Sequence, residues 1–449
     1  KFDKLLFFYL FIWVGNFSTI TMAELEQGTI IKLLNGKTCT VDSELGRGGQ
    51  GIVYLVDYCG GDFALKWYTR DYSDSFYNNL KRNADSGAPS NAFLWPLAVT
   101  EKQKGSFGYI MKLRPRGYRE FSDFMLAKVQ FSSMAANINA AIKICDAFQK
   151  LHIRGLSYQD MNDGNFFINP RNGDVLICDN DNVAPDKTNL GIIGKAGYLA
   201  PEIVDQKTMP NRYSDYFSMA VILFILFYFN RPFEGKKIAG CGCMTEDMEK
   251  AFFGHNAVFI MDPLDDSNRP VPGLHTNVIR RWGLFPKSME KLFIQAFSKQ
   301  SILFPEKRVI DREWMTLMIQ LRSMLCKCPH CGEETFVEPD SSNQVCLDCG
   351  RNIEKPMVLK VDKFRIPLFQ GQKIYNVQLP VDGDLNAIVG EVVRHSMTNR
   401  LGIKNYSTFT WQAIDPAGDV HNVSPEAGMP IKNEMKIKFK MGINGLIVK

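Results

Sequence analysis

The sequence lacks an excess of charge of one sign. Its 449 residues contain 53 Lys and Arg against 48 Asp and Glu, a net charge of +5, and the basic residues are scattered among acids. A nucleic-acid-binding protein more often concentrates its basic residues in a stripe, so we do not expect nucleic acid as a partner. The composition, with 45% hydrophobic residues, is typical of a globular protein, and the length predicts roughly three domains.

Long apolar runs are also scarce. The run at 217–229, FSMAVILFILFYF, has 13 residues where a membrane span needs about 20, so we expect a buried core helix there. A run at 5–14 is typical of a signal peptide or a short anchor, but Met22 opens an alternative start. We therefore interpret residues 1–22 as non-native in preference to a targeting segment. Unless this segment is a native anchor, we expect a cytoplasmic protein without a membrane partner.

Five of the eleven cysteines lie in one short segment, which argues against a secreted disulfide framework. Two knuckles, CPHCG at 328–332 and CLDCG at 346–350, are separated by 14 residues. Two residues between thiolates let one turn present both sulfurs to a tetrahedral zinc ion, and a redox pair would not explain the duplication. Cys326 and His330 are expected to be bystanders. The predicted ligands of a structural Zn²⁺ are Cys328, Cys331, Cys346 and Cys349.

Residues 44–53, ELGRGGQGIV, carry the spacing G-x-G-x-x-G at Gly46, Gly48 and Gly51. Glycines let a loop approach phosphate groups closely. The strand-like pattern continues after the last glycine, whereas a dinucleotide-binding motif would open a helix at this point. The context therefore favours a hairpin that covers phosphates, with a glycine-rich hairpin that binds no ligand as the alternative.

Further residues with the chemistry of phosphoryl transfer follow in order. This chemistry uses a lysine on the phosphates, a carboxylate that orients the acceptor hydroxyl, and an Asn and an Asp that hold magnesium. Any one of these matches could be accidental, but the whole series in one order is hard to obtain by chance. The series is FALK ending at Lys66, YQDMNDGN with Asp160 and Asn165, Asp179 after an apolar strand, APE at 200–202, and Asp215.

From about residue 40 to residue 320 the chain resembles the eukaryotic-like protein kinases. FLWPL at 93–97, FGYIM at 107–111 and GYLAPE at 197–202 are similar to a bacterial branch of these Ser/Thr kinases. The resemblance implies an α+β fold with two lobes, protein substrates, and a PP2C-type phosphatase and a von Willebrand A-domain protein as partners. The implied domains are an N-lobe at 23–113, a C-lobe at 114–325, a zinc ribbon at 326–355 and a β-rich domain at 360–449.

The resemblance also assigns roles to the residues of the series. Asp160 is the catalytic carboxylate, Lys66 contacts the α- and β-phosphates of ATP, and Asn165 and Asp179 hold Mg²⁺ or Mn²⁺. The implied ATP-binding set is Gly46, Gly48, Gly51, Val53, Ala64, Lys66, Met111 and Leu113.

Two implied roles are structural. Glu202 of the APE motif pairs with Arg308, and Asp215 braces the catalytic loop from the core helix. Neither role carries chemistry, so these residues are expected to stabilise the C-lobe.

Two departures from the kinase pattern concern activation. Lys66 normally pairs with a Glu on the following helix, but the acids between Lys66 and Trp95 are Asp71, Asp74 and Asp85. Gln159 replaces the Arg that usually precedes the catalytic Asp, and with it the receptor for an activation-loop phosphate is lost. We therefore do not expect switching by loop phosphorylation.

Two further departures concern the transferring phosphate. Asn162 stands where Ser/Thr kinases carry a Lys, and Lys195 stands where they carry a Thr. We hypothesise that the positive charge has moved, so that Lys195 steadies the phosphoryl group; a solvated loop lysine is the alternative. Asp181 replaces the Gly after the metal-binding Asp, and its carboxylate is a further candidate for the metal shell.

The last segment, from about residue 360, resembles a small β-sandwich of the forkhead-associated type, with a ubiquitin-like β-grasp as the alternative. The phosphothreonine-binding residues of the former family have no clear counterpart, so the sequence assigns no site here. The whole chain is interpreted as a protein kinase that transfers the γ-phosphate of MgATP to Ser or Thr. The alternatives are a pseudokinase scaffold and a zinc-ribbon adaptor.

Overall fold

The computed structural model describes residues 24–103, 105–188, 190–191, 194–341, 344–379, 383–440 and 442–449. The segment 1–22, interpreted above as non-native or targeting, lies outside these residues. The chain forms two compact units. The first contains the described residues up to Ser86 together with Pro96–Leu113, and the second contains Gly87–Trp95 and Arg114–Lys449.

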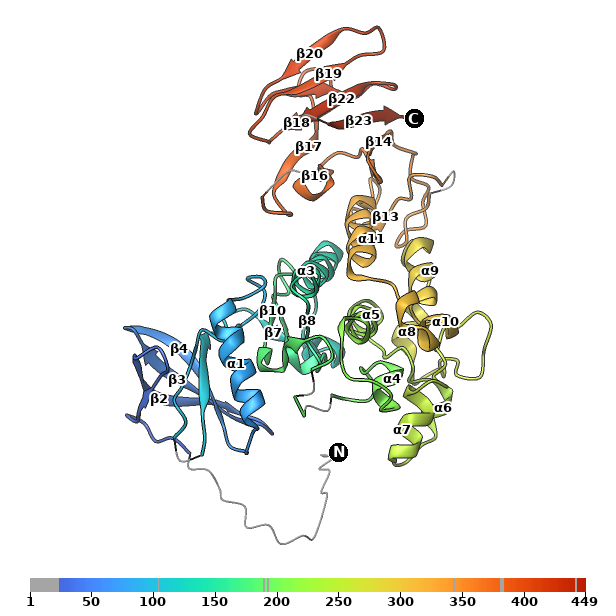
Figure 1. Ribbon diagram of the computed structural model, residues 1–449. Coiled ribbons are helices and arrows are strands. Elements are labelled where there is room, and N and C mark those ends of the chain that lie inside the picture. Colours follow the sequence, from blue (N-terminus) through green and yellow to red (C-terminus); the bar gives the residue numbers. More distant parts are fainter. Residues whose placement is uncertain are drawn as a thin grey trace, which may run out of the picture. The chain divides into compact units, whose positions relative to one another are not determined.

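The first unit is built on one antiparallel sheet with the strand order β1-β2-β3-β4-β6-β5 (Figure 1). Alternate residues of its strands, among them Ile52, Leu65 and Ile110, form a separate core on one face of the sheet. The elements are β1 (Ile30–Lys32), β2 (Thr38–Arg47), β3 (Gly51–Tyr58), β4 (Gly61–Tyr68), α1 (Asp74–Ser86), β5 (Ala98–Val99) and β6 (Gly108–Lys112).

The first part of the second unit is mainly helical. Its helices are α2 (Phe121–Met125), α3 (Met134–Ile153), α4 (Pro201–Val204), α5 (Arg212–Tyr228), α6 (Lys236–Ala239), α7 (Glu246–Phe253), α8 (Thr276–Arg281), α9 (Lys287–Ala296), α10 (Lys299–Leu303) and α11 (Asp311–Met324). Short strands and 3₁₀ turns lie between them: β7 (Arg119–Glu120), β8 (Leu156–Ser157), η1 (Asp163–Asn165), β9 (Phe166–Ile168), β10 (Val175–Ile177), η2 (Asn180–Asn182), β11 (Ala184–Pro185) and η3 (Pro305–Lys307).

Helix α5 is the centre of this helical part. It contains most of the apolar run at 217–229, and its residues from Ser214 to Tyr228 are all buried, which confirms the expected core helix. Among the described residues, no helix is both long and apolar enough to cross a membrane.

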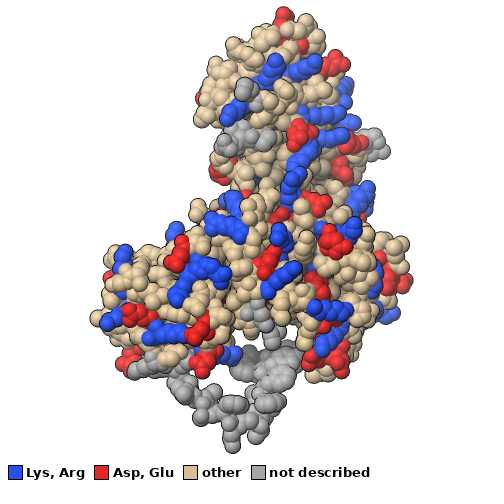
Figure 2. Space-filling model, viewed as in Figure 1, with Lys and Arg blue, Asp and Glu red and all other residues tan. Residues whose placement is uncertain are grey.

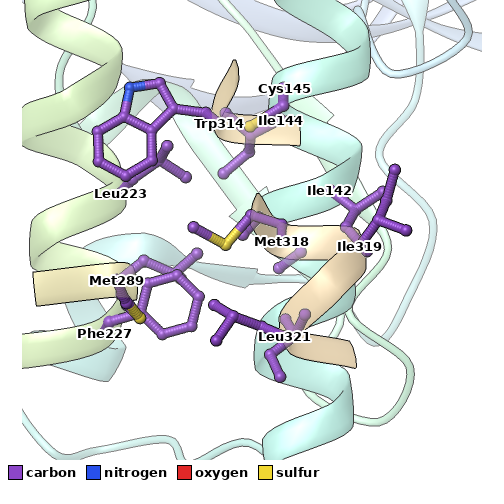
Figure 3. Packing of buried hydrophobic residues seen from close by; sticks show 14 of the residues in the cluster. Ile142, Ile144, Cys145, Leu223, Phe227, Met289, Trp314, Met318, Ile319 and Leu321 are labelled. Atoms are coloured by element: carbon purple, nitrogen blue, oxygen red, sulfur yellow. The ribbon is translucent and has the colours of Figure 1, made fainter. Parts of the chain in front are cut away.

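Helix α11 packs between α3 and α5 (Figure 3). Trp314, Met318 and Leu321 of α11 lie between the isoleucines of α3 and the apolar side chains of α5. The ring of Trp314 is 4.6 Å from that of Phe293 on α9. Four helices therefore share one continuous core, in which α11 is buried along its whole inner face.

The zinc-ribbon region continues directly from α11. Strands β12 (Leu325–Lys327) and β13 (Glu334–Phe336) form an antiparallel hairpin. Glu334 Oε2 accepts a hydrogen bond from the backbone N–H of Met134 at 2.5 Å, and the rings of Phe336 and Phe285 are 5.8 Å apart. The hairpin is therefore attached to the helical core at two points.

The C-terminal region forms two antiparallel sheets with the orders β15-β14-β23-β22-β19-β20 and β16-β17-β18-β21. The sheets face each other, because a Cβ added to Gly390 of β17 would lie 2.8 Å from the ring of Trp411 on β19. The elements are β14 (Val358–Val361), β15 (Phe364–Pro367), β16 (Lys373–Tyr375), η4 (Asn376–Gln378), β17 (Ile388–Arg394), β18 (Leu401–Asn405), β19 (Trp411–Ile414), β20 (Val420–Val423), β21 (Gly428–Pro430), β22 (Lys436–Lys440) and β23 (Ile443–Val448).

Helix α11 also holds this β-sandwich. The side-chain amide of Gln320 bonds both backbone groups of Arg365, accepting from its N–H at 3.0 Å and donating to its carbonyl at 2.6 Å. Buried Arg322 donates to Asn139 of α3 at 3.1 Å and to Asn386 of the sandwich at 2.6 Å. One helix thus contacts the helical core with one face and the sandwich with another.

The charges of the molecule are mixed over the face shown in Figure 2, where basic and acidic side chains alternate without a single-sign stripe. This distribution agrees with the small net charge of +5.

Candidate active site and metal centre

Four residues of the expected ATP-binding set lie on one face of the first unit's sheet. Val53 of β3 is directly opposite Lys66 of β4, and Ala64 of β4 is directly opposite Met111 of β6. Strand residues alternate between faces, and Leu65 points into the core on the other side. The structure therefore brings these four residues together on the face of the sheet opposite that core.

The glycine-rich hairpin joins β2 to β3. The N–H of Gly48 donates to the carbonyl of Gly51 at 2.9 Å across the turn. A Cβ on Gly51 would lie 2.1 Å from the carbonyl oxygen of Trp67, so only glycine fits beside β4. Gly46 and Gly48 have no heavy atom within 4 Å of an added Cβ, which leaves room for a ligand above the turn.

Lys66 is buried and its ammonium group contacts the hairpin. Its Nζ donates to Gln50 Oε1 at 2.7 Å and lies 5.7 Å from the centre of the Tyr68 ring. The Gln50 contact could not be predicted from the sequence, because a polar residue between glycines is usually solvated. The hairpin and the lysine are thus linked by a hydrogen bond.

The acids expected near Lys66 are all exposed. Asp74 opens α1 and pairs with Lys102, and Asp71 and Asp85 are exposed as well. The buried polar side chains of α1 are two amides, Asn79 and Asn83. A neutral amide cannot form the ion pair that the kinase pattern places here, so the departure noted in the sequence is also present in the structure.

Asp160 is held by two asparagines of its own loop. Asn162 Nδ2 donates to Asp160 Oδ1 at 3.0 Å, and Asn165 Nδ2 donates to the carbonyl of Asp160 at 2.8 Å. Burial raises the pKa of the Asp160 carboxyl, and the hydrogen bond from Asn162 opposes this shift. The carboxylate is therefore fixed in position, as a group that must orient a hydroxyl requires.

Asn165 and Asp179 are joined through the backbone. The N–H of Cys178, the residue before Asp179, donates to the carbonyl of Asn165 at 2.9 Å. Asn165 uses its Nδ2 on Asp160, which leaves Oδ1 as a ligand, and Asp179 adopts a left-handed conformation with φ 52° and ψ 44°. Amide and carboxylate oxygens are the ligands that Mg²⁺ prefers, so the two residues fit the expected cation.

Lys195 lies beside the catalytic loop. Its Nζ is 3.3 Å from Asp163 Oδ1, and its charge opposes the burial that raises the pKa of Asp160. The backbone here passes close to the carboxylate of Asp160, because a Cβ added to Gly194 would lie 3.2 Å from Asp160 Oδ1. The structure thus brings Lys195, which is 32 residues from Asp163 in the sequence, next to the loop at 158–165.

Gln159 makes a contact that its position in the sequence does not predict. It adopts a positive φ of 68°, and its Nε2 donates to the carbonyl of Thr188 at 3.0 Å. The neutral amide therefore binds the backbone of Thr188 directly, where the kinase pattern has an Arg that binds a phosphate.

Comparison with known proteins agrees with this geometry. Residues 39–256 match the family described as "Protein kinase domain". The chain contains a protein kinase domain. A "Probable serine/threonine-protein kinase PknB" of Corynebacterium glutamicum is 26% identical over 211 residues, which cover 44% of this chain and 32% of the relative. A serine/threonine-protein kinase/receptor of Acanthamoeba polyphaga mimivirus is 24% identical over 209 residues, covering 43% and 12%.

The chain therefore spans a third or less of the length of these two relatives. The matches support a eukaryotic-like Ser/Thr kinase domain, as the sequence predicted, and nothing in them favours the pseudokinase alternative. A kinase domain implies the use of ATP, a divalent metal ion and protein substrates.

The structural ion pair of the kinase domain is present. Arg308 donates to both carboxylate oxygens of Glu202, at 2.8 and 2.6 Å, and also to the carbonyls of Ser301 and Tyr213. The arginine is buried, so four hydrogen bonds compensate for its desolvation.

A buried histidine that the sequence analysis missed supports the catalytic loop. His152 Nε2 is 3.1 Å from Asp215 Oδ2, and its Nδ1 is 2.9 Å from Asp311 Oδ2. Asp215 Oδ2 also accepts the backbone N–H of Tyr158 at 2.7 Å, so Asp215 braces the loop as expected. Burial alone lowers the pKa of His152, but the two carboxylates outweigh it and raise the pKa to about 9.

The charge of His152 makes the stability of the kinase domain depend on pH. Because its folded pKa of about 9 is above the ordinary value of about 6.5, its contribution is complete below pH ~6.5 and is lost as pH rises through 9. We expect His152→Gln to remove about 3 kcal/mol of pH-dependent stability. Urea unfolding between pH 6 and 10 measures this. The control is His255→Gln, which removes a half-exposed histidine that also pairs with an aspartate, Asp205. An equal pH slope in wild type and His152→Gln would contradict the assignment.

The four cysteines of the knuckles form one cluster, whose Sγ atoms all lie within 4.8 Å of one another. The Sγ atoms of Cys328 and Cys349 are 3.8 Å apart, and those of Cys331 and Cys346 are 3.6 Å apart. Tetrahedral zinc with Zn–S bonds of about 2.3 Å requires about 3.8 Å. The thiolates therefore fit a closed, structural zinc site, and Cys326 is not part of the cluster.

Loss of this metal should loosen the attachment of the hairpin. We expect one zinc per chain in wild type, none in Cys346→Ser, and full occupancy in Cys326→Ser, measured by elemental analysis. Hydrogen exchange at the amide of Met134, which bonds Glu334, should be faster in Cys346→Ser and unchanged in Cys326→Ser. Zinc retained by Cys346→Ser would show that the four thiolates are not the ligand set.

Proposed function

We propose that the protein transfers the γ-phosphate of ATP to Ser or Thr hydroxyls of protein substrates. The observation that carries this proposal is the catalytic loop. Asn162 and Asn165 hold Asp160 at its side chain and backbone, and the backbone of Asn165 is joined to the strand end before Asp179. A chain without turnover would have no chemical need to order a carboxylate and two metal ligands in this way.

The proposed roles follow from the chemistry of each group. Asp160 orients the acceptor hydroxyl and accepts its proton, while Asn165 and Asp179 hold Mg²⁺ or Mn²⁺, which neutralises charge on the phosphates. Lys66 contacts the α- and β-phosphates in place of Gln50. The ATP-binding set is proposed as Gly46, Gly48, Gly51, Val53, Ala64, Lys66, Met111 and Leu113.

The domains are proposed with the boundaries given by the resemblance, namely 23–113, 114–325, 326–355 and 360–449. Two facing antiparallel sheets support a sandwich of the forkhead-associated type for the last domain. A PP2C-type phosphatase and a von Willebrand A-domain protein are proposed as partners on the resemblance alone. A cytoplasmic location is proposed because none of the eleven cysteines, all of which lie in the described residues, forms a disulfide.

The Asp160→Asn variant tests the proposed reaction. We expect at least a hundredfold loss of phosphate transfer from labelled ATP to a basic acceptor protein, with nucleotide affinity unchanged, because the amide cannot accept the hydroxyl proton. Equal turnover by the variant and the wild type would contradict the role of Asp160. ATP binding without turnover by the wild type would instead identify a pseudokinase scaffold.

Lys195 is proposed to stabilise the transferring phosphoryl group. Its contact with Asp163 and its electrostatic effect on Asp160 place a positive charge where Asn162 supplies none. We expect Lys195→Ala to lower kcat about tenfold to a hundredfold with little change in KM for ATP, and Lys195→Arg to restore part of it. Lys207→Ala is the matched control, since Lys207 is equally exposed and also paired with an aspartate. Unchanged turnover in Lys195→Ala would make this residue a solvated loop lysine.

A further inference from the structure

A groove of about 570 Å³ lies on the second unit, away from the catalytic loop in the sequence. It is lined by the end of α2 and the loop after it, the start of α3, the end of α5, and the segment around α8. Phe124, Phe131, Phe229 and Leu284 give it an apolar wall. Leu284 is 38% exposed, and Leu126 beside the groove is 63% exposed, so part of this apolar surface faces solvent.

The charge on the groove has one sign. Arg280 and Arg281 are its charged lining residues, and no acid is among them. Arg280 is exposed, and within the described parts of the chain it has no ion-pair partner. An apolar wall beside two guanidinium groups suits a ligand that carries both an apolar and an anionic group.

Among the residues that the structure describes, Arg281 has no counter-ion of the kind that a half-buried cation usually has. Its Nε donates to the carbonyl of Phe227 at 2.5 Å, and its guanidinium lies 4.8 Å from the ring centre of Phe229. Burial lowers its pKa, and no acid among the described residues offsets this effect. Desolvating a charge without a partner is costly, so the remaining donors of Arg281 are suited to an incoming carboxylate.

A buried amide adds a third, independent contact. Asn137 lines the groove and is 3% exposed. Its Nδ2 donates to the carbonyl of Leu226 at 3.2 Å, but its Oδ1 has no hydrogen-bond partner in the described part of the chain. Buried acceptors are nearly always satisfied. This oxygen is closed to solvent in the structure, so a backbone N–H of a bound segment would supply the missing donor after a small shift of the groove wall.

We propose that this groove binds an acidic peptide segment of a partner protein, in which a Leu, Phe or Met is next to a Glu or Asp. The apolar side chain would occupy the aromatic wall, the carboxylate would pair with Arg280 and Arg281, and the peptide backbone would donate to Asn137. A nucleic acid suits the groove less well. Its sugar–phosphate backbone offers no apolar side chain for the aromatic wall and no backbone N–H for Asn137. Because this binding requires no ATP, its failure would leave the proposed phosphotransfer untouched.

The experiment uses the full chain and an array of synthetic decapeptides. Each peptide places Leu, Phe or Met beside one or two Glu in a Gly/Ser background, and a matched array replaces every Glu with Gln. We expect the best Glu peptides to bind at least fivefold more tightly than their Gln counterparts in fluorescence anisotropy. Arg280→Gln, which alters an exposed side chain, and Arg281→Gln should each reduce this preference, whereas Arg312→Gln on exposed α11 surface should not.

Three outcomes would overturn the proposal. They are the absence of a preference for Glu, a preference that survives both Arg280→Gln and Arg281→Gln, and tighter binding of a dT₂₀ oligonucleotide or of phosphatidylserine vesicles than of any peptide. The last outcome would assign the arginines to a different class of anionic partner. If Arg281→Gln folds poorly, the peptide preference of Arg280→Gln is compared with that of the wild type and still tests the proposal.

Discussion

The kinase domain depends on one buried charge, the imidazolium of His152 between two carboxylates. Asp215 belongs to α5 and Asp311 to α11, and both lie within 3.1 Å of the ring. A buried carboxylate without a partner is strongly destabilising, so the single histidine compensates for both acids and holds the two helices against α3. Asp215 then has a lone pair free for the backbone of Tyr158, two residues before Asp160. The position of Asp160, the proposed catalytic carboxylate, is therefore set from the core of the domain.

Helix α11 transmits this order to the rest of the second unit. Asp311, the first residue of α11, contacts His152 of α3. Trp314 and Met318 fill the space between α3 and α5, and Arg322 near the end of the helix donates hydrogen bonds to both α3 and the sandwich. The guanidinium of Arg322 lies 3.6 Å from the ring centre of Tyr375, and burial lowers its pKa to about 10. A helix fixed at both ends by buried charges cannot shift along its axis without exposing one of them. The ribbon hairpin starts where this helix ends, so its position depends on the same contacts.

Local patterns in the sequence predicted the parts of the site that local geometry decides. Val53, Ala64 and Lys66 share a sheet face because strand residues alternate, and the spacing of the cysteine knuckles predicts the four cysteines whose Sγ atoms cluster. The contacts that cross the chain could not be predicted this way. His152 and Asp311 are 159 residues apart, and a histidine that ends an apolar helical stripe gives no sign of two carboxylate partners. Gln50 was also missed, since its contact with Lys66 depends on how the hairpin folds over β4.

The departures from the kinase pattern are consistent with one another in the structure. A loop that is ordered by a phosphate needs a cationic receptor, and this chain has Gln159 instead, which bonds the carbonyl of Thr188 without any modification. The same segment continues to Lys195, whose ion pair with Asp163 ties it to the catalytic loop a second time. The hydrogen bond of Gln159 and the ion pair of Lys195 are formed in the unmodified chain. They take the place of the arginine–phosphate contact, which would require phosphorylation. Neither contact requires a phosphate group, so the segment from Thr188 to Lys195 is held to the loop around Asp160 without any modification of the chain.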